Sequence, residues 1–320
     1  MTLDTMVSLA NRDLLSIDNL SAEEINAIVQ TALYLKAHRC DENSHSTALS
    51  GKSIALIFEK QSLRTNVSFQ VAVSELGGNS IYLGPEQIGM GSRESVSDVA
   101  RVLSRYVDGI VARVYHQATL NEMADYATIP VINALSDEEH PCQALGDLLT
   151  IYEKKGGFSG LTLAFFGDAK NNVSRSLMIA ADLVGMKYVI SAPEEYQPKD
   201  GTLATFGATV IEDPREAARV ADIIYTDVWA SMGQEEEAGT RAEALRGYQV
   251  NSDLVKLAKP DVLVMHCMPM HRGEEISADI LEKDDGTLTR FYQDIIDQAE
   301  NRLHAQKALF YLTFRKTPME

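Results

Sequence analysis

The chain has 320 residues, of which 45% are hydrophobic and 23% are charged, and 46 acidic against 29 basic side chains give a formal net charge of −17. The length and composition indicate a globular protein of two domains, and the acidity argues against nucleic acid as a partner, because nucleic-acid binding requires a basic face. Three cysteines without Cys-x-x-Cys spacing argue against a disulfide framework or a structural zinc site. No segment approaches the ~20 apolar residues of a membrane span, so we expect a cytoplasmic protein that contacts no membrane.

Apolar strands and amphipathic helices alternate along the first half of the chain. Ser21 and Glu24 form a capping-box pattern at the start of the first helix. Strands are predicted at 53–58, 80–83, 109–114 and 131–134, and the helices between and after them include 65–76 and 141–153.

The run Lys154-Lys155-Gly156-Gly157 is the best candidate for a linker, and the alternation restarts beyond it. Further strands are predicted at 161–166, 188–191, 221–225 and 262–265, and a final helix at about 294–312. Repeated alternation of strand and helix predicts an α/β protein with two doubly wound domains, each a mostly parallel sheet flanked by helices.

The junction between the first strand and its helix carries Ser62-Leu63-Arg64-Thr65. A helix N-terminus offers unpaired N–H groups, the hydroxyls add donors, and the arginine adds a planar fork that matches a phosphate. The spaced glycines of a P-loop are missing, so the pattern favours a small phosphorylated substrate held without metal. Alternatively, Ser62 only caps the helix and Arg64 is a solvated surface arginine.

Three more polar clusters follow apolar strands, where open parallel sheets bind ligands: His140-Pro-Cys142-Gln143, Thr226-Asp227-Val-Trp-Ala-Ser231-Met232-Gly233 and His266-Cys267-Met268-Pro269. Together with Ser62 to Thr65, Gly167-Asp-Ala-Lys-Asn-Asn172 and Gln298-Ala-Glu-Asn-Arg302, they resemble the aspartate/ornithine carbamoyltransferase family from about residue 53 to 302. The clusters that begin at Thr226 and His266 are similar to those of the ornithine-specific members of this family.

This resemblance implies transfer of a carbamoyl group from carbamoyl phosphate to L-ornithine, giving L-citrulline and phosphate, in arginine metabolism and without a cofactor. It also implies a carbamoyl-phosphate-binding domain (1–153), an ornithine-binding domain (154–293), a cleft between them that holds the active site, and a C-terminal helix (294–320) that packs back on the first domain. Family members are often trimers that share a loop between subunits, so we expect a homotrimer or a multiple of trimers.

The resemblance also assigns residues to the substrates. Arg113 is expected to bridge the phosphate and the carbamoyl oxygen, His140 to donate to that oxygen, and Gln143 to contact the carbamoyl amine. Carbamoyl phosphate is assigned to Ser62, Leu63 (through its backbone), Arg64, Thr65, Gln87, Arg113, His140, Gln143, Cys267, Met268 and Arg302. Ornithine is assigned to Asn172, Asp227, Ser231 and Met232, and the catalytic set is Arg113, His140, Asp227 and Cys267.

The residue types support a zwitterionic amino acid as the second substrate. Asp227 offers a carboxylate to an α-ammonium, whereas Ser231 and the backbone at Met232 offer donors to an α-carboxylate. Cys267 is expected to hold the side-chain amine, because that amine can attack the carbamoyl carbon itself and needs no covalent nucleophile.

Several alternatives stay open. Matching Gln-Ile-Gly places Gln87 at the position of the shared loop that reaches the neighbouring subunit, whereas counting back from Glu94-Ser95 places Gly89 there. Other acceptors are N-acylated ornithine, putrescine and aspartate, and the direction of the reaction is not fixed. An NAD-dependent dehydrogenase is disfavoured because the loop after Gly167 lacks the later glycines of a dinucleotide site, and a non-catalytic paralogue is disfavoured because the expected ligand-binding residue types are present.

Overall fold

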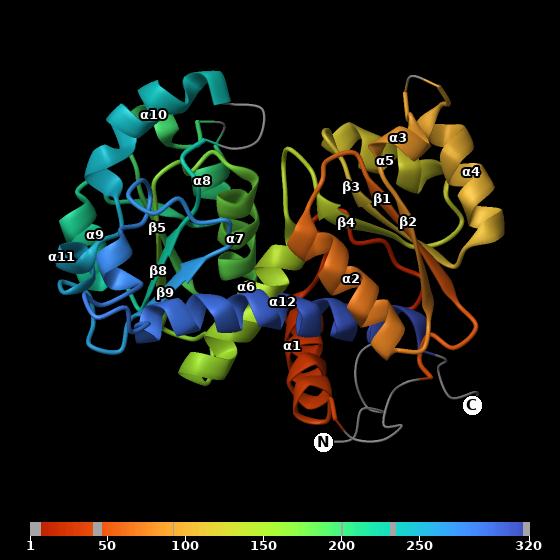
Figure 1. The fold of residues 1–320 in the computed structure, drawn as a ribbon, viewed down its shortest axis with the longest axis horizontal. Helices are drawn as coiled ribbons and strands as arrows, with labels where there is room; N and C mark the ends of the chain where they lie inside the picture. Colours follow the sequence, from red (N-terminus) through yellow and green to blue (C-terminus); the bar gives the residue numbers. More distant parts are fainter. Residues whose placement is uncertain (1–7, 41–46, 92, 200, 231–234, 316–320) are drawn as a thin grey trace. The chain divides into compact units, whose positions relative to one another are not determined.

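The computed structural model describes residues 8–40, 47–91, 93–199, 201–230 and 235–315 (Figure 1). The chain forms two compact units, one of Met1–Leu149 with Asn301–Glu320 and the other of Thr150–Glu300. The divisions fall inside two helices, α6 (Pro141–Lys155) and α12 (Arg290–Phe314). Each unit is built around its own sheet.

The first unit contains a parallel sheet in the order β2-β1-β3-β4. Its strands are β1 (Ser53–Phe58), β2 (Asn79–Leu83), β3 (Gly109–Arg113) and β4 (Val131–Leu135). Helices α4 (Val96–Tyr106) and α5 (Gln117–Tyr126) pack on one face through Ala100 and Met123. Toward the other face lie α1 (Ala22–Ala37), α2 (Leu63–Glu75) and the end of α12, where Phe69 meets Phe310 at 5.7 Å between ring centroids.

Helices of the first unit begin where capping residues predict them to begin. Ser21 and Glu24 form the predicted capping box of α1, and Ser62 and Ser95 cap α2 and α4 with their side-chain oxygens. The short helix α3 (Pro85–Ile88) starts with a proline at its first position.

The second unit contains a parallel sheet in the order β7-β6-β5-β8-β9. Its strands are β5 (Thr162–Phe166), β6 (Lys187–Ser191), β7 (Thr209–Val210), β8 (Ile223–Thr226) and β9 (Leu263–His266). Its helices are α7 (Asn172–Leu183), α8 (Thr202–Thr205), α9 (Pro214–Val220), α10 (Ala238–Leu245) and α11 (Ser252–Val255). Side chains of α9 and α11 join Phe166 and Ile224 in one core, and Thr226 pairs with His266, so β8 and β9 end side by side.

The predicted α/β fold with two parallel sheets is confirmed. Within the predicted linker at 154–157, Lys154 and Lys155 form the last residues of α6, and Gly156 and Gly157 follow the helix. Lysines in the last turn of a helix interact favourably with its dipole, and Lys154 also forms ion pairs with Asp294 (3.0 Å) and Asp297 (2.6 Å). In the described part of the chain, no helix combines the length and apolar character needed to cross a membrane.

Gly146 allows α6 and α12 to approach each other closely within the first unit. A Cβ atom at this position would lie 3.0 Å from Cα and 3.2 Å from the backbone nitrogen of Arg302. Because these are backbone atoms, relief would require movement of a helix. Gly146 therefore allows the backbone of α12 at Arg302 to lie close to α6.

We predict that Gly146→Ala lowers the thermal unfolding temperature, since overpacking a tight contact costs ~1–3 kcal/mol. Differential scanning calorimetry measures the effect, and Gly239→Ala is the matched control. Gly239 lies in α10 with nothing within 4 Å of an added Cβ, so that change should be neutral or slightly stabilising. Equal unfolding temperatures for Gly146→Ala and wild type would contradict the tight contact.

Candidate active site

Ser62 to Thr65 form the N-terminus of α2 at the carboxyl end of β1. Ser62 Oγ accepts a hydrogen bond from Thr65 N–H (3.4 Å) and donates to Thr65 Oγ1 (3.0 Å), so this serine does cap the helix. Leu63 is 76% exposed, which leaves its backbone as the group available to a polar ligand. Capping and ligand binding are compatible because the first N–H groups of the helix still face outward.

Arg64 adds an unpaired cation to this helix start. Its half-buried side chain makes no hydrogen bond or ion pair with any residue that the structure describes, and no acidic residue lies in the first turn of α2. The guanidinium and the positive end of the helix therefore combine into an anion-binding point on an otherwise acidic chain.

Arg113 and His140 lie at the ends of neighbouring segments of the same unit. Arg113 is the last residue of β3, is 5% exposed, and accepts a hydrogen bond at its carbonyl from Glu59 N–H (2.8 Å). His140 is 4% exposed and accepts at its carbonyl from Gln143 N–H at the start of α6 (3.0 Å). Burial, followed by the charges of Arg302 and Arg113, lowers the pKa of His140 well below its usual value, so its imidazole is neutral at pH 7.

Gln143 connects this cluster to α12. Its Oε1 accepts from Arg302 Nη1 (3.1 Å), and its Nε2 donates to Asp147 Oδ1 (2.9 Å). The structure therefore brings together Arg113, His140, Gln143 and Arg302 in one buried cluster of the first unit. Cys142 lies apart, since it donates to Asn133 O and burial raises the pKa of its thiol to about 12, which fits a packing role.

Lys60 is a charged neighbour that the sequence did not single out. Burial lowers its pKa first, the charge of Arg113 lowers it further, and Asp137 and Glu59 oppose the shift. Its ammonium also lies 4.5 Å from the ring centroid of Tyr115. Its position two residues before Ser62 was the only signal in the sequence.

Gln87 lies apart from the cluster on α3. Its side chain is exposed, and its carbonyl accepts from Arg93 Nη2 (3.0 Å). A role in a neighbouring subunit stays a prediction for this residue.

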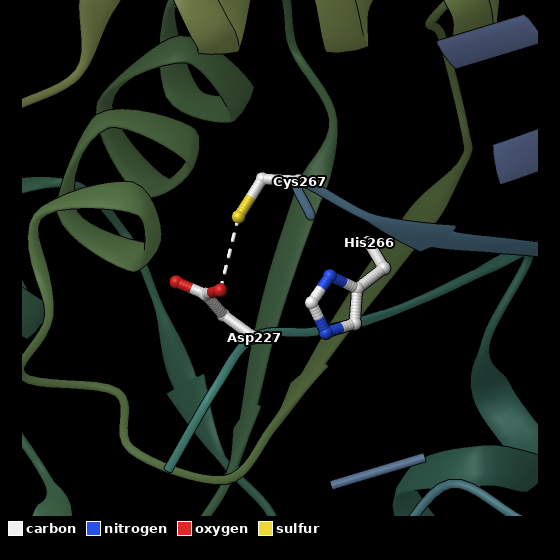
Figure 2. Close-up of side chains that lie close together, drawn as sticks. All are labelled: Asp227, His266 and Cys267. Carbon is white, nitrogen blue, oxygen red and sulfur yellow. Dashed lines mark hydrogen bonds between the residues drawn. The ribbon is translucent and has the colours of Figure 1, made fainter. Parts of the chain in front are cut away.

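Asp227 and Cys267, from the ends of β8 and β9, meet in the second unit (Figure 2). Cys267 Sγ donates to Asp227 Oδ1 (3.0 Å), and the same oxygen accepts from Val228 N–H (2.8 Å). Asp227 is 6% exposed, and burial raises its pKa, although His266, Cys267 and Val228 act in the opposite direction. The predicted amine-binding pair is thus assembled from two separate strands.

Asn171 is a second contact of Asp227 that sequence reasoning missed. Its Nδ2 donates to Asp227 Oδ2 (3.3 Å), while its Oδ1 caps α7 by accepting from Ser174 N–H (2.7 Å). Asn172, the residue that was predicted, is the half-buried first residue of the same helix. The Asn-x-x-Ser spacing was a usable capping signal for Asn171.

A buried His266–Glu275 pair holds the segment that carries Cys267. His266 Nδ1 accepts from Met268 N–H (2.9 Å), so Nε2 carries the proton and donates to Glu275 Oε1 (2.9 Å). Met268 adopts a positive φ of 57°, which is uncommon for a residue with a side chain. The histidine therefore supports a turned backbone rather than facing a ligand.

Asp227, His266 and Cys267 could in principle hold a metal ion, since one ligand atom of each lies within 4.8 Å of the others. Both ring nitrogens of His266 are already engaged, and the Cys267 thiol donates a hydrogen bond to Asp227. A metal would have to break these hydrogen bonds, so the arrangement fits an organic amine better.

Ser231 and Met232 lie outside the described residues. The chain is fixed on both sides of them, because Arg241 forms an ion pair with Asp168 (2.7 Å) and donates to the carbonyl of Trp229 (3.4 Å). Gly167 packs against the indole of Trp229, where an added Cβ would lie 3.3 Å from the ring.

Comparisons with known proteins agree with this arrangement. Residues 12–153 match the family model described as the carbamoyl-P binding domain of aspartate/ornithine carbamoyltransferase, and residues 159–313 match its Asp/Orn binding domain. The protein of Pyrococcus furiosus named as an anabolic ornithine carbamoyltransferase is 48% identical over 96% of this chain and 98% of its own length. The ornithine carbamoyltransferase of Archaeoglobus fulgidus is 48% identical over 93% of this chain and 96% of its own length.

Solved structures show the same likeness. The ornithine carbamoyltransferase of Pyrococcus furiosus superimposes with a TM-score of 0.89 at 47% identity, covering 98% of this chain and 100% of the other. The enzyme from Thermus thermophilus gives a TM-score of 0.84 at 42% identity, covering 95% and 99%. The chain therefore belongs to the aspartate/ornithine carbamoyltransferase family.

Proposed function

We propose that the protein is an ornithine carbamoyltransferase, which transfers the carbamoyl group of carbamoyl phosphate to the side-chain amine of L-ornithine and releases L-citrulline and phosphate. The hydrogen bond between Cys267 and Asp227 carries the assignment, because it places a carboxylate and a thiol where an amine can bind. The relatives at 46–48% identity carry the same name, and the one from Pyrococcus furiosus is named as anabolic, which favours citrulline synthesis.

The first unit supplies the groups that carbamoyl phosphate requires. The N-terminus of α2 and Arg64 bind the phosphate, while Arg113 and the neutral imidazole of His140 polarise the carbamoyl oxygen. A neutral histidine can donate a hydrogen bond to that oxygen as its negative charge grows. Gln143 is oriented by Arg302 and Asp147 before the substrate binds, so little side-chain entropy is lost on binding.

The second unit supplies the groups that ornithine requires. Asp227 attracts an ammonium group, and Asn172 and the predicted donors at Ser231 and Met232 serve the amino-acid end. Cys267 acts as a hydrogen-bond donor to Asp227 through its thiol. Direct attack by the amine follows: its nitrogen bonds to the carbamoyl carbon, the bond to the phosphate oxygen breaks, and the amine proton is released.

We also propose a homotrimer, supported by exposed apolar side chains on adjacent elements of the first unit. Leu63 and Val67 lie one turn apart on α2, and Ile81 and Tyr82 lie on the edge strand β2 next to it. Exposed apolar side chains on an edge strand commonly mark a protein–protein contact. A cytoplasmic location is supported by the exposed free thiol of Cys40.

Arg64→Ala should weaken carbamoyl phosphate binding about a hundredfold or more, because a charge-assisted contact to phosphate contributes a few kcal/mol. The Michaelis constant for carbamoyl phosphate and calorimetric titration measure this loss. Arg105→Ala, which removes an exposed arginine of α4, should leave both unchanged. An unaltered Michaelis constant and turnover for Arg64→Ala would refute the phosphate site.

Asp227→Asn should impair the use of ornithine far more than binding of carbamoyl phosphate, because it removes the carboxylate that faces the amine.

The choice of acceptor is tested by comparing citrulline formation from ornithine with carbamoylation of N-acetylornithine, putrescine and aspartate. The wild type should use ornithine well and the other three poorly. Preference for an acylated ornithine would overturn the assigned acceptor, and equal loss of both substrates in Asp227→Asn would make Asp227 a structural residue.

The value of kcat/KM for ornithine should rise by about one log unit per pH unit between about pH 7 and 9, since the lysine-like amine of free ornithine has a pKa near 10.4 and must be neutral to attack. His140, whose pKa is lowered, is already neutral across this range and adds no step. Cys267→Ser should keep partial activity with the same pH dependence. A dead Cys267→Ser variant, together with a carbamoylated Cys267 seen by mass spectrometry, would instead establish a covalent mechanism.

A further inference from the structure

A cavity of about 230 Å³ lies in the second unit, and none of the proposed ornithine residues that the structure describes lines it. Lys170 enters it from the loop before α7, Arg175 and Met178 from α7 itself, and Lys199 and Thr202 from the segment that leads into α8. Met178 is buried, so the cavity has an apolar floor below a polar and cationic rim.

The charges around this cavity are of one sign. Lys170, Arg175 and Lys199 contribute to its lining, and the described lining residues include no carboxylate. The ammonium groups of Lys170 and Lys199 form no hydrogen bond or ion pair with described residues. Asp168, two residues before Lys170, is already engaged with Arg241 at 2.7 Å.

Several other lysines of the same unit are paired, although Lys187 and Lys283 form no ion pair with described residues either. Lys154, Lys155 and Lys259 each form an ion pair with an aspartate, at nitrogen–oxygen distances of 2.6 to 3.0 Å. In a chain with 46 acidic residues, pairing is thus readily available to a lysine. Cations gathered around a cavity whose described lining holds no carboxylate repel one another, and an anion bound between them offsets that repulsion.

We propose that this cavity is a second anion-binding site, for a small ligand with at least two negative charges such as inorganic phosphate or a polycarboxylate. The volume accommodates a small molecule, and the lining places Thr202 beside the cations. The site is distinct from the phosphate site at Ser62 to Thr65, which belongs to the other unit. The inference rests on the charges of the cavity and not on the proposed reaction.

Calorimetric titration of the full chain with inorganic phosphate and, separately, with citrate at low ionic strength tests the proposal. The titration is run on wild type and on Arg64→Ala, which removes the main cation of the other phosphate site. The test variant is Lys170→Gln/Lys199→Gln, and both substituted lysines are exposed, so folding should be preserved. Lys187→Gln/Lys256→Gln is the matched control, because it removes two exposed lysines of the same unit that do not line this cavity.

We expect one site per chain that survives in Arg64→Ala, is weakened at least tenfold in the test variant, and is unchanged in the control. Binding of phosphate alone identifies a phosphate site, and binding of citrate alone identifies a polycarboxylate site. The proposal is overturned if neither anion binds to Arg64→Ala, or if the control variant loses affinity as much as the test variant does.

Discussion

Charge held out of water is the physical constraint on which the candidate residues of each unit depend. Arg113 and Arg302 in the first unit and Asp227 in the second are nearly inaccessible to solvent. A buried ion costs several kcal/mol unless its surroundings compensate for the lost hydration. Part of the compensation is local: Gln143 accepts from Arg302, and Cys267 and Asn171 donate to Asp227. The proposed ligands have the opposite charge in each unit, an anion in the first and an ammonium in the second.

The parts of the fold that depend on local chemistry were predictable from the sequence. The periodicity of apolar residues placed the strands, and the serines at positions 21 and 62 marked helix starts, because both signals act within a few residues. Parallel strands end at the same edge of a sheet, and this topological rule predicts that the clusters at Asp227 and Cys267 lie close together. The structure places their side chains 3.0 Å apart.

Contacts between distant segments were not predictable in the same way. Arg302 and Gln143 are 159 positions apart, and their hydrogen bond exists because Gly146 lets two helices approach. The sequence around Lys60 and Glu275 carries no motif. Tertiary packing alone brings Lys60 near Arg113 and Glu275 into contact with His266. Lys154 and Lys155, the last residues of α6, were assigned to the linker for a related reason, since the ion pairs of Lys154 with Asp294 and Asp297 are long-range contacts that the local sequence does not show.

The burial of Asp227 also bears on how a neutral amine can form. A fully charged carboxylate would hold ornithine as its ammonium form, which cannot attack. Desolvation raises the pKa of Asp227, and the same desolvation lowers the pKa of an amine bound beside it, so the two values move toward each other. As that gap narrows, loss of the amine proton requires less free energy. Cys267 donates a hydrogen bond to Asp227 Oδ1 without adding a charge. In the proposed mechanism the thiol can therefore be a hydrogen-bonding partner of the amine both before and after the amine loses its proton. Burial of the Asp227 carboxylate costs folding free energy, and in the proposed mechanism the same burial favours the neutral, nucleophilic form of the amine.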